Sequence, residues 1–392
     1  MTSNRSYRKS HPWITFQVDL RKASPDFWIM LGECHSKCEH LAGVPLSPEI
    51  NRYMHQVYLA KGVAATTAIE GNTLSEKQVL EHIEGTLELA PSQDYLKKEI
   101  DNIIKGCNLV LGEIEAGKQP PVNLERIKQL NRIVLDGLKP ADHEAIPGEI
   151  RLHSVGAGRY RGAPARDCEF LLQKLAEWLN GPDFVGKPGT EIMFAILKAI
   201  LAHIYIAWIH PFGDGNGRTA RLLEVQILLS SGVPSPAAQL LSNHYNRTRS
   251  EYYRHLDIAR TDLIAFLSYA IQGFRDELRE QIATVRDQQL EIAWINHVHR
   301  MFHGLKGFPH DRRKRLALAL SNTEDPVPFN KLTELSARVA LDYKDRTYRT
   351  LLRDVKALQK MNLIKRNEDG KWEAKRETIL AFLPVRADKN LT

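Results

Sequence analysis

Twelve residues near the middle of the chain, HPFGDGNGRTAR from His210 to Arg221, combine residue types that suit the chemistry of phosphate groups. Glycine and asparagine permit positive φ and a close approach of the backbone, and they form the turn Gly215, Asn216 and Gly217. A turn of this kind that leads into a helix presents free N–H groups and a positive dipole end to an anion. Arg218 and Arg221 are three residues apart and share one helical face, so the turn is suited to a polyphosphate.

The two remaining polar side chains of the segment could complete a catalytic site. Asp214 is a hard oxygen ligand, suited to a Mg²⁺ ion that bridges phosphates. His210 ends the preceding helix and could take a proton from a hydroxyl that attacks phosphorus. The alternative is a structural loop in which His210 caps a helix and Arg218 forms a surface salt bridge.

The segment resembles the signature of the Fic (filamentation induced by cAMP) family, HPFx[DE]GN[GK]RxxR, at every defined position. The resemblance spans about residues 45–285 and implies a mostly helical fold. Most enzymes of this family transfer AMP from ATP to a Ser, Thr or Tyr hydroxyl of a protein and release pyrophosphate. The resemblance implies these roles: His210 as general base, Asp214 as Mg²⁺ ligand, Gly215, Asn216 and Gly217 as anion hole, Arg218 as phosphate ligand, and Arg221 as ligand of the γ-phosphate.

A further part of the family resemblance lies downstream, in residues 246–256, NRTRSEYYRHL. This stretch is similar to the family segment that helps to hold the nucleotide base. The resemblance therefore assigns Tyr252 and Tyr253 to ATP binding, with packing in the core as the alternative for at least one of them.

Residues 66–72, TTAIEGN, resemble the inhibitory motif of the family, [ST]xxxE[GN], with Thr66, Glu70 and Gly71 at the defined places. The motif precedes the catalytic segment, which is typical of the class with an N-terminal inhibitory helix. Glu70 would pair with Arg221 and occupy the place of the γ-phosphate, and a carboxylate–arginine pair suits this role. In some relatives the same glutamate positions a water that removes AMP from a modified target, so both directions stay open.

Helical periodicity dominates residues 46–286 and predicts an all-α core. The predicted helices cover residues 47–70, 75–90, 92–117, 123–138, 168–180, 190–209, 216–231, 248–258 and 262–285. The apolar run 192–209 is long enough to span a bilayer, but Lys198 and His203 interrupt it, so a buried core helix is expected. Residues 147–167 contain four glycines and alternating residues around Gly156–Gly158, which predicts a β-hairpin, with a surface glycine-rich loop as the alternative. The hairpin resembles the family's flap, which clamps a target backbone as an added strand.

The overall composition is that of a soluble globular protein, with 392 residues, 43% hydrophobic residues and a net charge of +7. Four cysteines do not make a disulfide framework, which favours a reducing compartment. The basic N-terminus lacks the apolar region of a signal peptide, so a cytoplasmic location without a membrane segment is expected.

After residue 286 the pattern changes to that of a winged helix-turn-helix. Helices are expected near 287–304, 311–320, after Pro328 and over 345–361, followed by strands at 363–366 and 371–374. One face of helix 345–361 carries five cations: Arg346, Arg349, Arg353, Lys356 and Lys360. Such a face suits DNA, whereas a merely solvated face or a protein-docking module is the alternative.

These observations predict an all-α Fic-type core with a small hairpin flap and a C-terminal winged helix. The expected parts are an N-terminal extension (1–45), a helical region with the inhibitory helix (46–110), the catalytic core (111–286) and the winged helix (287–392). The expected reaction uses ATP and Mg²⁺ and modifies a target protein or the chain itself. A DNA-binding regulator with the Fic core as its switch is the alternative function, and a homodimer is left open.

Overall fold

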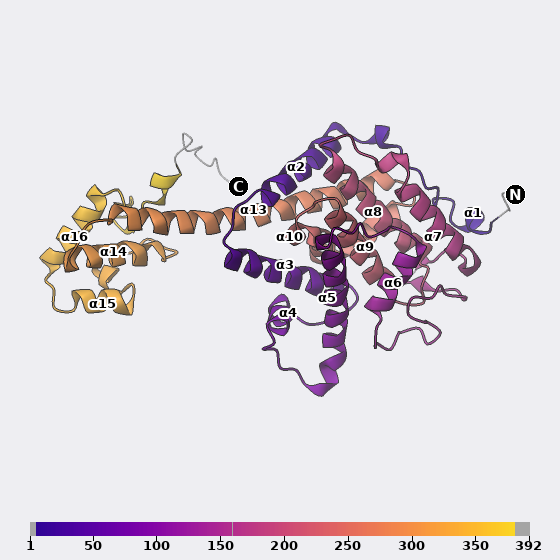
Figure 1. The fold of residues 1–392 in the computed structure, drawn as a ribbon, viewed down its shortest axis with the longest axis horizontal. Coiled ribbons are helices and arrows are strands. Elements are labelled where there is room, and N and C mark those ends of the chain that lie inside the picture. The colour runs from indigo at the N-terminus through magenta and orange to yellow at the C-terminus, as the bar shows by residue number, and fades with distance from the viewer. Residues whose placement is uncertain (1–4, 159, 381–392) are drawn as a thin grey trace. The chain divides into compact units, whose positions relative to one another are not determined.

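The computed structural model describes residues 5–158 and 160–380, and the chain divides into two compact units at Ile282 and Ala283 (Figure 1). The expected extension, helical region and catalytic core fall in the first unit up to residue 282. The ends of the predicted ranges, residues 1–4 and 381–392, and Arg159 of the predicted hairpin lie outside the described residues.

The first unit is built almost entirely of helices, which confirms the expected mostly helical fold. Its α-helices are α1 (Tyr7–Ser10), α2 (Pro25–Ala42), α3 (Pro48–Ala68), α4 (Glu76–Ile83), α5 (Asp94–Glu115), α6 (Leu124–Val134), α7 (Ala165–Leu179), α8 (Glu191–Ile209), α9 (Asn216–Ser230), α10 (Ser235–Ala238), α11 (Leu240–Arg247), α12 (Arg249–Ile258) and the first part of α13 (Leu263–Met301). Short 3₁₀ helices are η1 (Leu20–Lys22), η2 (Pro91–Gln93) and η3 (Pro182–Phe184).

Helix α8 is the apolar centre of this unit. Within the described part of the chain it is the one helix that is long and apolar enough to cross a membrane, and 78% of its apolar stretch is buried inside the protein. Helix α9 packs against α8, α5 and α6, and these helices lie together in Figure 1. A helix buried on nearly all sides must be apolar all round, which explains the composition of α8. The turn between α8 and α9 is therefore held between two packed helices.

The N-terminal extension differs from the expectation of scattered aromatics and turns, because it contains the helix α2. Ser24 caps this helix by accepting a hydrogen bond from the Phe27 N–H, and a proline follows at the first helical position. The buried side chains recur at helical spacing: Phe27, Leu31, Cys34 and Cys38. Two of the apolar positions are cysteines, so the periodic face was easy to overlook in the sequence.

The predicted hairpin is present but small. Strand β1 (Gly156–Ala157) pairs antiparallel with β2 (Tyr160–Arg161), and Gly156 lies opposite Arg161. Gly156 is therefore in a strand, whereas Gly158 lies in a turn with φ 58°. The described rest of residues 147–167 is irregular up to the start of α7, and the N–H groups of Arg151 and Ala163 donate to the carbonyls of Pro211 and Ile209 at 3.1 and 3.2 Å.

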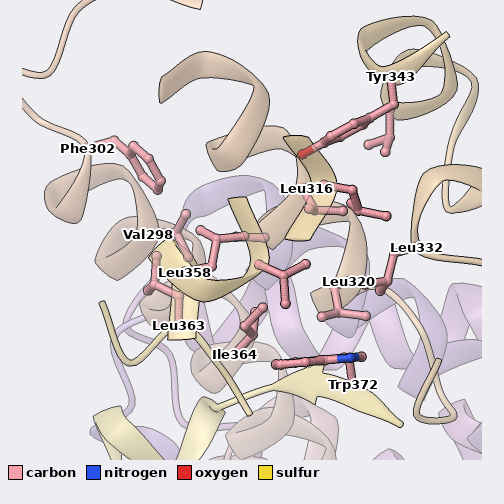
Figure 2. Close-up of a cluster of buried hydrophobic side chains, with 14 of the residues drawn as sticks. Val298, Phe302, Leu316, Leu320, Leu332, Tyr343, Leu358, Leu363, Ile364 and Trp372 are labelled. Atoms are coloured by element: carbon pink, nitrogen blue, oxygen red, sulfur yellow. The ribbon is translucent and has the colours of Figure 1, made fainter. Parts of the chain in front are cut away.

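The C-terminal unit has its own hydrophobic core. Its elements are the second part of α13, then α14 (Phe308–Ser321), η4 (Phe329–Glu334), α15 (Ala337–Tyr343), α16 (Tyr348–Lys360), β3 (Ile364–Arg366), β4 (Trp372–Ala374) and η5 (Arg376–Ile379). Figure 2 shows side chains from α13, α14, α16 and the β3–β4 sheet converging on this core, with Val298, Leu320, Leu358, Ile364 and Trp372 among them.

Two predicted helices of this region are corrected by the structure. The ranges 262–285 and 287–304 form one continuous helix, α13, of 39 residues. Residues 274–301, which include the expected break, contain no glycine or proline, so nothing there interrupts helical propensity. Helix α16 starts at Tyr348 rather than 345, because Thr347 adopts an extended backbone as its N-cap. Arg346 therefore precedes the helix, and Tyr348 at its first position is 68% exposed.

A buried carboxylate joins three helices of the C-terminal unit. Asp354 of α16 is fully buried and accepts hydrogen bonds from Arg312 Nε and Arg313 Nε of α14, at 2.8 and 2.7 Å. The hydroxyl of Tyr343 on α15 donates a third, at 3.0 Å. Three charge-assisted or polar contacts on one carboxylate satisfy its buried oxygens.

We expect Asp354→Ala to lower the free energy of unfolding of the C-terminal unit by about 3–5 kcal/mol, because the buried Arg312 would lose its counter-ion. Denaturant unfolding of the full chain measures this change. The exposed Asp345 provides the matched control, and Asp345→Ala should change stability little. Equal stability of the two variants would contradict the assigned role of Asp354.

Candidate active site

The site is centred on the turn between α8 and α9, which begins at His210. This residue ends α8 in a left-handed conformation, with φ 49° and ψ 59°, and its N–H donates to the Ile206 carbonyl at 2.8 Å. The side chain is half-buried, and burial is the main reason why the pKa of His210 is lowered to about 4. The imidazole is therefore neutral near pH 7, which is the form that accepts a proton.

The turn itself is held open by Asn216. Its side chain accepts a hydrogen bond from the Phe212 N–H at 3.0 Å and donates one to the Phe212 carbonyl at 2.8 Å. Gly215 has φ 74°, a conformation that favours glycine, and no side chain caps the N-terminus of α9. An uncapped helix start leaves backbone N–H groups and the positive dipole end for an anion.

Asp214 lies at the edge of this turn. One carboxylate oxygen accepts from the Ala141 N–H at 2.9 Å, and the other accepts from Arg218 Nη2 at 3.2 Å. Among the described residues, no group of three or more His, Cys, Asp or Glu side chains could hold a metal ion. Mg²⁺ commonly takes one or two protein carboxylates and completes its shell with phosphates and water. Asp214 therefore fits a Mg²⁺ that arrives with a nucleotide, and not an all-protein site.

Arg221 is almost completely buried, with 1% of its side chain exposed, and it contacts the predicted inhibitory segment. Its Nε donates to the Thr66 hydroxyl at 2.9 Å, and its Nη2 donates to the Thr66 carbonyl at 3.0 Å and to Glu70 Oε1 at 2.6 Å. Burial alone would raise the pKa of Glu70, but Arg221 outweighs that effect and keeps the pKa below its usual range. Glu70 therefore stays ionised beside Arg221.

The Glu70 carboxylate also lies against the start of α9. A Cβ atom on Gly217 would overlap with Oε1 of Glu70, so the glycine is needed for this approach. Arg249 Nη2 donates to the carbonyl of the preceding Ile69 at 2.7 Å, and Gly71 follows in a positive-φ conformation, φ 105°. The negative charge of Glu70 thus occupies the position where an anion would meet the helix dipole.

Arg218 is held by a carboxylate that the sequence did not reveal. Its Nη1 donates to Glu99 Oε1 of α5 at 2.8 Å. The other oxygen of Glu99 accepts from Nδ2 of Asn72 at 2.8 Å, two residues after Glu70. Both arginines of the turn are therefore paired with carboxylates from distant parts of the chain. Glu99 carries no sequence signal, because it lies on an ordinary amphipathic helix.

The family model that matches the chain is the Fic/DOC family, over residues 121–228. This range starts before α6, includes the hairpin, and ends near the C-terminus of α9, so it contains His210, Asp214, Arg218 and Arg221. Residues 121–228 are a Fic domain.

Curated relatives and solved structures agree with this Fic domain. The chain is 28% identical over 258 residues to protein adenylyltransferase fic-1 of Caenorhabditis briggsae, covering 66% of this chain and 48% of that protein. It is 31% identical over 196 residues to protein adenylyltransferase Fic of Drosophila ananassae, covering 50% of this chain and 35% of that protein. The chain therefore spans about half or less of the length of these relatives.

Two solved structures share the fold. Fic-1 (residues 134–508) of Caenorhabditis elegans matches with a TM-score of 0.53 and 25% identity, covering 67% of this chain and 73% of that chain. A Fic family protein from Desulfovibrio desulfuricans G20 has a TM-score of 0.55 and 18% identity, covering 90% of this chain and 96% of that chain. The second likeness concerns the fold alone.

Asn131 on α6 is a second residue that sequence reasoning missed, and it lies within the matched Fic range. Its Nδ2 donates to the Asp214 carbonyl at 3.0 Å and to the Thr219 hydroxyl at 3.1 Å. Its Oδ1 accepts from the Gly148 N–H at 2.9 Å. This fully buried amide therefore joins the catalytic turn to the start of the hairpin segment. A polar residue within a buried helix face was the available signal.

The two tyrosines assigned to the nucleotide base lie in different surroundings. Tyr252 is buried, its hydroxyl bonds to Nε2 of His203 at 2.7 Å, and its ring stacks on Tyr245 with centroids 4.8 Å apart. Tyr253 is 45% exposed. Tyr252 is thus part of the core beside the site, whereas Tyr253 offers a free ring surface.

The predicted basic residues of the C-terminal unit are all exposed: Arg346, Arg349, Arg353, Lys356 and Lys360. Four of them lie on α16, and the Arg346 guanidinium lies 5.7 Å from the ring centre of Phe308.

We expect Asn131→Ala to lower the free energy of unfolding by about 1–3 kcal/mol, because the buried Gly148 N–H and Asp214 carbonyl would lose their partner. Amide hydrogen exchange should also become faster at Gly148. The exposed Asn322 serves as the control position, and Asn322→Ala should leave both measurements unchanged. Unaltered exchange at Gly148 in Asn131→Ala would exclude the proposed link.

Proposed function

We propose that this protein transfers AMP from ATP to a Ser, Thr or Tyr hydroxyl of a target protein or of the chain itself. The observation that carries the proposal is the neutral His210 beside the uncapped start of α9, with Arg218 and Arg221 buried at the same turn. The relatives named protein adenylyltransferase support the same reaction class.

The proposed reaction transfers one proton, forms one bond to phosphorus and breaks another. The imidazole of His210 takes the hydroxyl proton while the oxygen bonds to the α-phosphorus of ATP. The bond between the α-phosphorus and the bridging oxygen breaks, and pyrophosphate leaves. Transfer of this kind depends on positioning and charge neutralisation, which Arg218, Arg221 and the N–H groups of α9 would supply. A Mg²⁺ held by Asp214 would neutralise phosphate charge when bound.

We further propose that Glu70 inhibits the enzyme. Its carboxylate pairs with Arg221 at 2.6 Å and lies against Gly217. A phosphate at the same place would meet a negative charge and would lack its arginine. Like charges placed together cost several kcal/mol, so productive ATP binding would require Glu70 to move.

We expect Glu70→Gly to raise AMP incorporation about tenfold or more over the parent, because the like charge at the phosphate position is removed. The measurement is mass spectrometry of the intact protein after incubation with ATP and Mg²⁺, together with labelled ATP. Glu84→Gly changes an exposed glutamate at the end of α4 and should leave incorporation unchanged.

The combination of Glu70→Gly with His210→Ala should abolish incorporation while nucleotide binding persists. Incorporation that is undiminished in the combined variant would exclude His210 as the base. If Glu70→Gly gains no activity while the parent removes AMP from a modified target, removal of AMP becomes the favoured direction.

We propose a second, separate role for the C-terminal unit, as a winged helix that contacts DNA. The order α14, α15, α16 and the antiparallel pair β3–β4 is that of a winged helix-turn-helix. None of the five basic residues forms an ion pair with a described residue. Residues 290–392 contain 21 Lys+Arg and 13 Asp+Glu, a net charge of +8, whereas the rest of the chain has −1. Exposed, unpaired cations on one helix suit a polyanion.

We expect the triple change Arg349→Ala, Arg353→Ala and Lys356→Ala to weaken binding to random duplex DNA and to reduce the salt slope by about 3. Fluorescence anisotropy over a salt series measures both. As the control, replacement of the exposed Lys118, Lys139 and Lys187 of the first unit by alanine removes the same total charge. It should change neither the affinity for DNA nor the salt slope. Absence of binding by the parent at low salt would favour a protein partner instead.

We also propose a cytoplasmic location. All four cysteines are buried and free within the structure: Cys34, Cys38, Cys107 and Cys168. Burial raises the pKa of Cys38 to about 12 and that of Cys107 to about 11, so these thiols are unreactive. Free, inert thiols are compatible with a reducing compartment.

A further inference from the structure

His210 has an unusual backbone conformation for a residue with a side chain. Only three described residues other than glycine have a positive φ: Phe16, His210 and Asn362. Such a conformation persists where the surrounding structure determines it, and it is found preferentially at functional sites. The contacts that hold the backbone of His210 therefore decide where its imidazole lies.

Arg151 supplies the main contact to this backbone. Its Nε donates to the His210 carbonyl at 2.8 Å, and its own N–H donates to the Pro211 carbonyl at 3.1 Å. Arg151 thus bonds to two consecutive carbonyls, one from its side chain and one from its main chain. The peptide unit after His210 is restrained from both directions.

The same guanidinium joins the two sides of the hairpin segment. Nη1 donates to the His153 carbonyl at 2.5 Å, and Nη2 donates to the Ala163 carbonyl at 2.5 Å. A Cβ atom on Gly162 would collide with both His210 and Arg151, so the segment needs a glycine there to pack this closely. The hairpin and the backbone of His210 are therefore fixed to one side chain.

Arg151 is 4% exposed, and it has no carboxylate at ion-pair distance among the described residues. Burial lowers its pKa, and its three side-chain contacts are all neutral carbonyls. A planar guanidinium has five donors in a fixed fork, whereas a lysine has one flexible ammonium. Only arginine can therefore donate to the three carbonyls at once. Lysine keeps the positive charge but lacks the planar shape, so the effects of the shape and of the charge of Arg151 can be tested separately.

We infer that Arg151 is a positioning residue for His210, which fixes the left-handed backbone of the general base and ties the hairpin to it. The inference rests on the proposed function, since it assigns His210 the role of base. Arg151 does not contact the reacting atoms in this role, so its effect should fall on turnover and not on nucleotide binding.

The charges around His210 provide a readout that a purely structural role would not move. Burial has the largest effect and lowers the pKa of His210, a hydrogen bond to the Ala207 backbone raises it, Arg151 lowers it, and Glu70 and Asp214 raise it. Removal of the Arg151 charge should therefore raise the pKa of His210. Because a base must be neutral, the acidic limb of the pH–activity curve should move to higher pH.

The test compares Arg151→Met and Arg151→Lys in the Glu70→Gly background of the full chain. We expect both to lower kcat about 10- to 100-fold, because the base is misplaced, with the Kd of ATP within about twofold of the parent. NMR titration of ¹³C-labelled histidine, with His210→Ala to assign the signal, should show a raised pKa in Arg151→Met. Arg151→Lys keeps the charge and should show a pKa near that of the parent.

Arg126→Met is the matched control, because Arg126 is also 4% exposed but bonds to Glu113 and Gln226 away from His210. It should lower stability without changing kcat or the titration of His210. Unchanged kcat and pKa in a folded Arg151→Met protein would overturn the inference, as would a loss of ATP affinity equal to the loss of kcat. If the Glu70→Gly parent transfers no AMP, the proposed function fails, whereas the NMR titration still decides the role of Arg151.

Discussion

The start of α9 concentrates positive charge on groups that are shielded from solvent. The dipole end of an uncapped helix, Arg218 and Arg221 all lie at the turn after His210, and both arginines are nearly buried. Buried positive charge requires negative partners nearby. In the structure these partners are three carboxylates, Glu70, Glu99 and Asp214. A bound polyphosphate would supply the same negative charge. The need to neutralise the positive groups at the start of α9 therefore accounts both for the ion pairs seen in the structure and for the proposed reaction.

This constraint explains why the proposed inhibitory segment, residues 66–72, and the turn after His210 form one network. Glu70 is paired with Arg221, while Asn72 bonds to Glu99, which in turn bonds to Arg218. Displacement of Glu70 would release Arg221 directly. The segment that follows Glu70 is tied through Asn72 to Glu99, which is the partner of Arg218. The packing of α8 and α9 keeps the turn itself rigid, so the carboxylates are the parts of the network that can exchange with a ligand.

The C-terminal unit also pairs buried arginines with a carboxylate, but it carries a surplus of positive charge. Its one fully buried carboxylate, among the described residues, is Asp354, which accepts from two arginines of α14. That pairing neutralises Arg312 and Arg313 of α14, whereas Arg349, Arg353, Lys356 and Lys360 of α16 form no ion pair with a described residue. The surplus charge of the whole chain therefore comes from residues 290–392, while the first unit is nearly balanced. The proposed nucleotide binding in the first unit would accordingly depend on a few placed groups and not on bulk charge.

The sequence alone determined the features whose residues are close along the chain. Residue types and spacing within residues 210–221 predicted an anion-binding turn, and the apolar composition of α8 predicted the core helix, because such patterns are local along the chain. The resemblance of residues 66–72 to a family motif pointed to Glu70. Only the tertiary structure brought in Glu99, Asn131 and Arg151, whose partners in the turn lie 59 to 119 residues away. Side chains of ordinary type at such separations carry no local pattern. Their importance arises only when packing of the helices places a buried charge or carbonyl beside them.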